Sequence, residues 1–319
     1  MFSSRMPFRS LSSALTAVLL IAASGLLDSG LARAQSEPSE EKADSTHGFQ
    51  YELSGRFSGT QAAYRAWQEG GLSTLSFTST VDGAAEREKD RWWQRHELRL
   101  SFGLITSEAD EADEPIRKTE DQIQAKSRSR YTGTGFFRHF KPTLSARFRT
   151  QFANGFDYSE NPYSTSHPFA DREAPVITSA FFAPAVFVET MGLTYAPKDW
   201  YSLSLGAASK QTVIRRRNLR VLYGVAPNKS ARVEVGAELG ATVDRQIAKN
   251  VHYESSATVF LSVGQIEEPP DARWENYITM NVNSWLTTNL EFTALFDQNI
   301  SDAIQLKEVL SVGVNVDFI

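Results

Sequence analysis

ARVEVGAELGATVD, at residues 231–244, alternates charged or polar residues with apolar ones at a period of two. Val233 and Leu239 fall on one face, and Glu234 and Glu238 fall on the other. Because successive side chains of a β-strand point to opposite faces, this stretch predicts a strand with one apolar and one charged face. It is longer than the usual strand of about five or six residues, and that length is typical of strands that cross a membrane.

The same alternation recurs along the chain, between polar connections that contain Gly or Pro. Leu98 and Leu100 oppose Arg99 in one segment, and the last segment alternates from Leu310 to Phe318, which is typical of the closing strand of an outer-membrane barrel. We therefore predict an all-β fold, an antiparallel transmembrane β-barrel of about 12 strands, with 10 or 14 as alternatives. The predicted strands are 50–59, 71–81, 94–104, 118–131, 142–153, 184–196, 200–210, 230–244, 251–264, 273–283, 286–297 and 305–318.

The connections between these segments differ in length in a regular way. An even number of strands places both ends of the barrel on the periplasmic side, where short turns are expected at 197–199, 246–250 and 284–285. Longer connections are expected to face outward. They are residues 105–117, 154–183, 211–229, 265–272 and 298–304, while the connection 82–93 is long for a periplasmic turn.

The N-terminus predicts export through a cleaved signal peptide at residues 1–34. Arg5 and Arg9 precede an apolar run, and Ala32-Arg33-Ala34 offers small residues at a cleavage site. We expect a disordered segment at 35–49 and the barrel at 50–319, in the bacterial outer membrane.

Composition excludes several classes of protein. The mean hydropathy of −0.33 argues against a polytopic helical membrane protein, and the absence of Cys excludes disulfides and Cys-ligated metals. Residues 1–34 hold three basic residues and one acidic residue, so the mature chain has 30 basic and 37 acidic residues and a net charge of −7. Nucleic acid is therefore not expected as a partner. No cofactor or metal is predicted.

Several short motifs resemble an uncharacterised family of outer-membrane β-barrels, a domain of unknown function found in Bacteroidetes-type bacteria. The resemblance extends over most of residues 50–319 and implies the barrel fold but no activity, substrate or catalytic residue. The motifs are Trp67 with Gly70-Gly71, Lys118-Thr119-Glu120-Asp121, Thr150-Gln151-Phe152, Gly155-Phe156-Asp157-Tyr158, Phe182-Ala183-Pro184-Ala185 and Gln305-Leu306-Lys307-Glu308-Val309-Leu310.

If the apolar faces contact lipid, the opposite faces bring many charged side chains into the lumen. The lumen-facing candidates are Lys126, Arg128, Arg147, Arg149, Arg232, Glu234, Glu238, Glu254 and Glu291. The four residues from Lys126 to Arg149 are expected to form a basic wall, and Glu234, Glu238 and Glu254 an acidic wall. One interpretation is a structural ladder of ion pairs that fills the lumen, and the other is a charged constriction that selects small polar or anionic solutes.

We expect a porin or transporter for such solutes, with two alternatives. A lipid-active enzyme resembling a phospholipase would place a Ser and a His in contact on the outer wall, yet no nucleophile motif accompanies His47, His96, His139, His167 or His252. A structural or adhesion barrel would act through its extracellular loops, of which 154–183 is long enough to constrict the lumen or to stand outside it. Expected partners are membrane lipid and the barrel-assembly machinery, which would read the C-terminal strand.

Two charged runs have simple interpretations. The acidic run from Glu108 to Glu114 offers ligands of the kind Ca²⁺ accepts, but it lacks the spacing of a known calcium loop and reads as a solvated loop. The basic run Arg215-Arg216-Arg217 could contact lipid phosphates and also reads as a solvated loop.

Overall fold

The structure, a computed structural model, describes residues 48–62, 73–107 and 116–319. Within these ranges twelve strands close into one antiparallel barrel, and two further strands form a small separate sheet. No helix of the described ranges is long and apolar enough to cross a bilayer. The predicted twelve-stranded barrel is therefore confirmed. The predicted signal peptide 1–34 and residues 35–47 of the predicted disordered segment lie outside the described residues.

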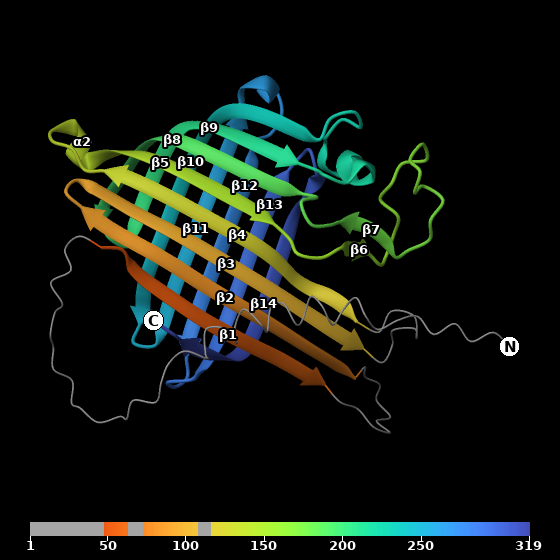
Figure 1. Ribbon diagram of the computed structural model, residues 1–319, viewed down its shortest axis with the longest axis horizontal. Helices are drawn as coiled ribbons and strands as arrows, with labels where there is room; N and C mark the ends of the chain where they lie inside the picture. The colour runs from red at the N-terminus through yellow and green to blue at the C-terminus, as the bar shows by residue number, and fades with distance from the viewer. Residues whose placement is uncertain (1–47, 63–72, 108–115) are drawn as a thin grey trace. The chain divides into compact units, whose positions relative to one another are not determined.

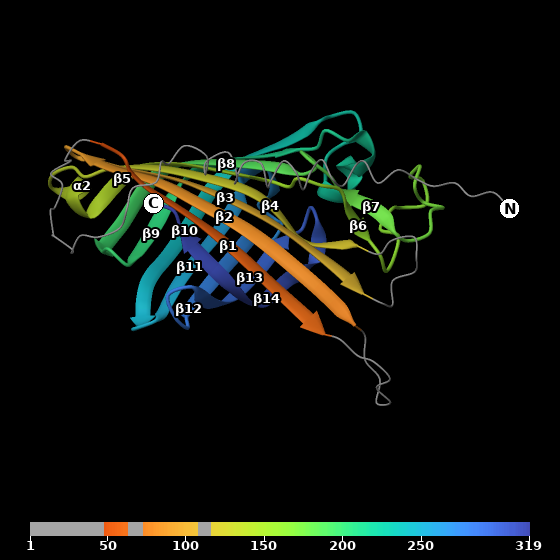
Figure 2. The same ribbon diagram turned by 60° about the horizontal axis from the view of Figure 1, so that its bottom comes forward.

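The barrel strands follow one another around the ring in chain order, and Figures 1 and 2 show their steep tilt. They are β1 (Gln50–Ala62), β2 (Thr74–Lys89), β3 (Trp92–Ser107), β4 (Arg117–Tyr131), β5 (Phe140–Thr150), β8 (Ala185–Lys198), β9 (Tyr201–Val213), β10 (Ala231–Ala248), β11 (Val251–Ser262), β12 (Asp271–Asn281), β13 (Leu286–Asp297) and β14 (Ser301–Asp317). The chain interrupts this order once, between β5 and β8, where β6 (Gly155–Asp157) and β7 (Val176–Ser179) pair with each other.

Most outward-facing side chains of the barrel strands are apolar, and most inward-facing ones are polar. On β10, Val233 and Val235 are 63% and 61% exposed, whereas Glu234 and Glu238 are only 6% and 5% exposed. A soluble sandwich would bury the apolar face instead. The barrel therefore has the inverted pattern of a sheet that is surrounded by lipid.

One predicted connection is wrong. Residues 82–93 were expected to form a long turn, but β2 and β3 extend through them and are joined by Asp90 and Arg91 alone, with Asp90 in the left-handed region at φ 57°. The predicted strands ended where the apolar alternation ends. The real strands continue beyond the apolar band with charged side chains, including Arg87 and Lys89, because backbone pairing does not depend on an apolar face.

Most of the remaining connections follow the predicted alternation of short and long, but the predicted long connection 298–304 is wrong, because β14 already begins at Ser301 and only residues 298–300 join it to β13. The end of the barrel that holds the start of β1 and the end of β14 has tight connections, the longest containing α2 (Phe136–His139). The opposite end has the longer connections. They include residues 151–184, η1 (Arg217–Tyr223) between β9 and β10, and η2 (Val263–Gln265) between β11 and β12.

Two of the long connections share a small hydrophobic core. Tyr163 and Val176 from the predicted loop 154–183 cluster with Ile214 and Leu219 from the connection around η1. Tyr163 donates its hydroxyl to the carbonyl of Ile177 at 2.5 Å, and burial raises the pKa of this phenol to about 12. The loop is therefore a packed unit at the end of the barrel that carries the long connections.

The pairing of β8 with β9 depends on two facing glycines. Gly192 and Gly206 are partners in this register, and a Cβ added to Gly192 would lie 2.1 Å from the carbonyl oxygen of Leu205. No side chain fits there without separating the strands, because the obstacle is backbone.

Replacing this glycine should destabilise the barrel. We expect Gly192→Ala to cost about 1–3 kcal/mol, the usual range for overpacking. The control is Gly83→Ala on β2, whose added Cβ would make only ordinary contacts, with the Leu53 side chain at 3.7 Å and the Glu52 carbonyl oxygen at 3.9 Å. Urea unfolding followed by far-UV circular dichroism measures both, and equal midpoints for the two variants would contradict this role of Gly192.

Candidate functional site: the charged lumen

Glu275 on β12 is the centre of a belt of charge that crosses the lumen. Its carboxylate lies 2.8 Å from the guanidinium of Arg149 on β5 and 3.9 Å from the ammonium of Lys126 on β4. Around the ring of strands β12 lies five positions from β5 and six from β4, so these contacts join opposite walls. Arg273, two residues along β12, adds a third cation at 2.8 Å. Three cations therefore surround a carboxylate that is 5% exposed.

A second ion pair across the lumen joins β5 to β10 beside this belt. Arg147 makes a two-pronged ion pair with Glu238, with one guanidinium nitrogen 2.9 Å from Oε1. The hydroxyl of Thr190 on β8 donates to the same carboxylate oxygen at 3.0 Å. Two parallel bonds to a carboxylate fix its geometry more firmly than a single contact. The basic face of β4 and β5 is thereby held against the acidic face of β10 and β12.

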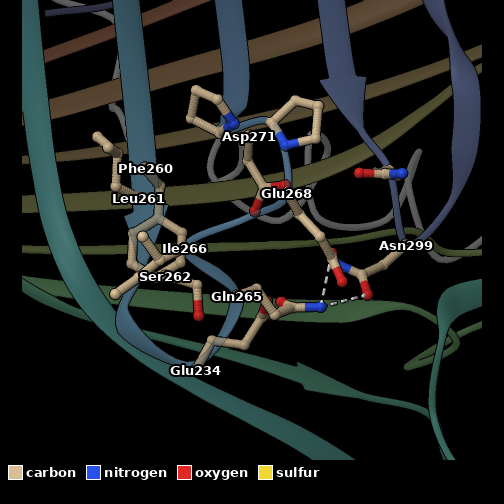
Figure 3. Close-up of a pocket in the computed structure, with 12 residues that line it drawn as sticks. Glu234, Phe260, Leu261, Ser262, Gln265, Ile266, Glu268, Asp271 and Asn299 are labelled. Carbon is tan, nitrogen blue, oxygen red and sulfur yellow. Dashed lines mark hydrogen bonds between the residues drawn. The ribbon is translucent and has the colours of Figure 1, made fainter.

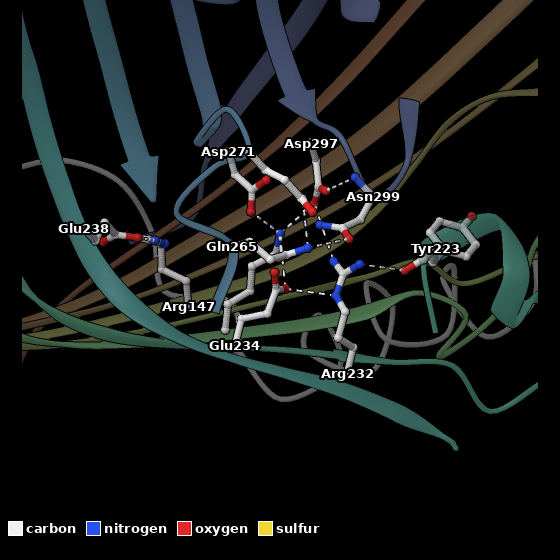
Figure 4. Close-up of polar contacts among 11 residues, drawn as sticks. Arg147, Tyr223, Arg232, Glu234, Glu238, Gln265, Asp271, Asp297 and Asn299 are labelled. Carbon is white, nitrogen blue, oxygen red and sulfur yellow. Dashed lines mark hydrogen bonds and ion pairs between the residues drawn. The ribbon is translucent and has the colours of Figure 1, made fainter. Parts of the chain in front are cut away.

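A separate cluster fills the lumen toward the long connections. Lys210 on β9 donates to Asp271 and Asp297, each at 2.6 Å, and lies 3.9 Å from Glu234. Arg232 adds an ion pair to Glu234 at 3.0 Å, and Figure 4 shows these side chains converging from several strands. Two cations face three carboxylates here, so the cluster carries a net negative charge.

A small pocket of about 60 Å³ borders this cluster at the ends of β10, β11 and β12 (Figure 3). Gln265 lines the pocket and donates to Glu268 at 2.8 Å and to Asn299 at 3.5 Å. The volume is room for a few water molecules rather than for a solute of any size.

The other end of the lumen holds the larger space. A cavity of about 420 Å³ opens at the end with the short turns and reaches Arg99 and Lys126 at the edge of the belt. Arg99 pairs with Asp82 at 2.5 Å and lies over the ring of Tyr277 on the far wall at 4.4 Å. Cations and carboxylates line this vestibule in similar numbers. They are Glu52, Arg56, Asp82, Arg95, Glu97, Arg99, Lys126 and Glu254.

The structure brings together most, but not all, of the predicted lumen residues. Lys126, Arg147 and Arg149 of the predicted basic wall contact carboxylates, and Arg232 pairs with Glu234. Glu291 lies 3.8 Å from Lys307, whose ammonium also pairs with Glu120. Arg128 has no ion pair within 4 Å among the described residues, and Glu254 lines the vestibule beside His252 at 3.3 Å instead of facing the predicted basic wall.

Sequence reasoning missed the residues at both centres, Glu275 and Lys210, together with Asp271. Glu275 stands in ARWENYITM, where Asn276 interrupts the apolar face and hides the alternation. Lys210 is the last residue of one predicted segment and Asp271 lies just before another, and the true strands include both. The available signal was that Glu275 lies at a spacing of two from Arg273 and from Tyr277, which puts all three on the same face of the strand.

The remaining candidates are dispersed. His47 and the acidic run 108–114 lie outside the described residues, and Arg215-Arg216-Arg217 is exposed. His167 stacks on Tyr163 within the loop core, with ring centroids 4.1 Å apart. In the described part of the chain no three His, Asp or Glu side chains are grouped as a metal site would require.

His96 differs from the other histidines because it has a hydroxyl partner. Its Nδ1 lies 3.0 Å from Oγ of Ser127 on the neighbouring strand, and the two residues are partners in the register of β3 with β4. Both are out of phase with the inward residues Glu97 and Lys126, so the pair lies on the outer wall.

Comparison with known proteins gives a partial match to one family model and no activity. The model of a family described as a protein of unknown function, DUF3078, matches residues 60–156. No curated protein matches the chain in sequence. The Bacteroidetes origin implied by the earlier resemblance is not supported by these matches.

Two solved structures are among those that resemble this chain at a low level. An outer membrane channel from Pseudomonas putida F1 is 10% identical, with a TM-score of 0.37 over 89% of this chain and 100% of that one. The translocator domain of the autotransporter NalP from Neisseria meningitidis is 11% identical, with a TM-score of 0.35 over 96% of both chains. At such low scores we draw nothing about activity from them.

Removing the central carboxylate should leave three cations together in the lumen. We expect Glu275→Gln to destabilise the barrel by about 3–5 kcal/mol, the range for breaking a buried ion pair from one side. Glu254→Gln is the matched control, since Glu254 is exposed in the vestibule. Urea unfolding compares the two, and a Glu275→Gln barrel as stable as wild type would show that the belt adds no stability.

Proposed function

We propose that this chain is an outer-membrane barrel whose lumen is a charge-selective pathway for small polar or anionic solutes, closed in the present conformation. The observation that carries the proposal is the set of ion pairs that join opposite walls, with Glu275 between Lys126 and Arg149. A lumen that carries cations on one wall and carboxylates on the other presents a transverse field to a solute. The vestibule beneath the belt offers a solute access to that field.

The outer surface supports the membrane location. Apolar side chains cover the outward face of the strands, and exposed aromatic residues gather at the end with the short turns. Trp92 packs on Tyr131, Phe140 on Tyr195, and Trp200 beside Tyr201. Such a girdle is typical of the interface between lipid and water. The alternating strand β14 is our proposed contact for the assembly machinery.

Conductance in a planar bilayer tests the pathway. We expect wild-type barrels to conduct weakly. The double variant Arg147→Ala with Arg149→Ala should conduct severalfold more, because two ion pairs across the lumen are lost, and it should prefer anions less, because two cations are lost. Arg215→Ala with Arg216→Ala, a change of equal charge in an exposed loop, should behave as wild type.

The opposite outcome is equally informative. A folded, heat-modifiable double variant that stays silent would exclude the pathway and favour a structural or adhesion barrel. The loops that share the Tyr163 core would then be the part to study.

The pair His96 and Ser127 favours a second candidate, a lipid esterase on the outer wall. The imidazole Nδ1 is placed to accept the Ser127 proton while Oγ attacks an ester carbonyl. The histidine would return that proton to the departing alcohol, and water would then hydrolyse the acyl-serine. Trp92 and Tyr131 of the girdle lie four residues away on the same strands, which places the pair near the depth of lipid ester groups.

An active-site probe separates this candidate from an ordinary hydrogen bond. A fluorophosphonate should label wild-type protein in lipid micelles and should not label Ser127→Ala or His96→Asn. Ser129→Ala is the control, because Ser129 lies on the same face of β4 and pairs with Gln94 instead of a histidine. Labelling that is absent in wild type, or unchanged in Ser127→Ala, would end this candidate.

A further inference from the structure

The seam between β1 and β14, where the barrel closes, is paired over only part of its length. The register runs from Ser54 to Ser58 on β1, and Ser58 opposes Gly313. Two further backbone hydrogen bonds join Leu53 to Phe318 and Ile319 at the end with the short turns. Toward the long connections the pairing stops.

The strands themselves continue beyond that point. β1 extends to Ala62, paired with β2 throughout, and β14 begins at Ser301, paired with β13. Continuing the register would oppose residues 59–62 to residues 309–312. All eight residues are described, and no pair joins them across the seam.

Gly313 marks the last point of close approach. A Cβ added there would lie 2.6 Å from the carbonyl oxygen of Phe57 on β1. At Gly59, one step farther along the seam, the three nearest atoms to an added Cβ all belong to Ser76 and Phe77 on β2. Thus β1 and β14 touch at Gly313 and separate immediately afterwards.

An unpaired edge at this place is costly in a membrane. Leu310 and Val312 on β14 are exposed, so this stretch of the edge lies within the apolar band. Lipid offers no hydrogen-bond partner, and each unsatisfied backbone group there costs several kcal/mol. An edge that is retained in such surroundings is expected to have a use or an occupant.

The two sides of the gap differ in chemistry. Outside are the exposed side chains of Phe57, Leu310 and Val312. On the inner side of β14, Ser311 opposes Asn289, whose carbonyl Oδ1 is buried and has no hydrogen-bond partner among the described residues. Farther along the same face is Lys307, which lies between Glu120 and Glu291. At the unpaired seam, polar side chains of the inner face therefore lie next to apolar side chains of the outer face.

We propose that the gap between β1 and β14 is a lateral port for a membrane amphiphile. The polar headgroup enters the lumen at Ser311 and Asn289 while the acyl chain remains in the bilayer. The gap begins near the middle of β14 and extends toward the end with the long connections, which is the outer side of an outer-membrane barrel. This inference rests on the proposed membrane location but not on conduction of ions or solutes.

Fluorescence quenching tests whether lipid reaches the lumen through the gap. The chain contains no Cys, so Ser311→Cys, Ser101→Cys and Val312→Cys each carry one bimane label in phosphatidylcholine vesicles. Ser101 is a buried inward residue on β3, and Val312 is an outward residue beside the gap. With a nitroxide lipid as quencher, we expect the Ser311 label to be quenched nearly as strongly as Val312 and severalfold more than Ser101. Quenching of Ser311 as weak as that of Ser101 would overturn the port.

Disulfide formation provides a second measurement that does not depend on lipid. Phe57→Cys with Val314→Cys, which are partners in the register, should oxidise readily, whereas Thr60→Cys with Ser311→Cys should not. Equal oxidation of the two pairs would show a closed seam and overturn the proposal. Covalent dimers of a Leu310→Cys variant would also overturn it, because the edge would then pair with a second copy of the chain.

A result here can be separated from the conductance experiment. A barrel that is silent in the bilayer but quenched at Ser311 keeps the port and loses the solute pathway. A conducting barrel with an unquenched Ser311 does the reverse. Heat-modifiability on gels establishes that each variant is folded before it is used.

Discussion

The pairing of charge across the lumen is the interaction on which the rest of this structure depends. With its apolar faces turned outward, the barrel directs its ionisable side chains into an interior where an unpaired charge is costly. Glu275 meets that constraint by contacting cations from the opposite wall, and Glu238 does so with Arg147. The walls are thereby held at a separation that two side chains can span.

These contacts join parts of the chain that are far apart in sequence. Arg149 and Glu275 are separated by 126 residues, and Glu120 and Lys307 by 187. They can form only when the strands are in their final register and the ring has closed. The local hydrogen bonds of each hairpin therefore form the sheet, and the ion pairs stabilise the barrel only after it has closed.

The lumen is arranged in layers of different character. An anionic cluster around Lys210 lies toward the long connections, the Glu275 belt crosses the middle, and a vestibule of mixed charge opens at the other end. The seam between β1 and β14 adds a sideways route into the lumen.

The sequence by itself determined the fold class, the number of strands and the side of each strand that faces the lumen. Alternation with a period of two is a local property, and β13 begins and ends where it was predicted to. Strand ends were less predictable, as in β2 and β3, because pairing continues beyond the apolar band. Only the tertiary structure decided which charges meet. The stagger and tilt of a closed barrel determine which residues face each other across it, so Glu275, Lys210 and the contact of His96 with Ser127 could not be read from spacing. The incomplete seam likewise depends on where two ends of the chain meet in space, which no local pattern records.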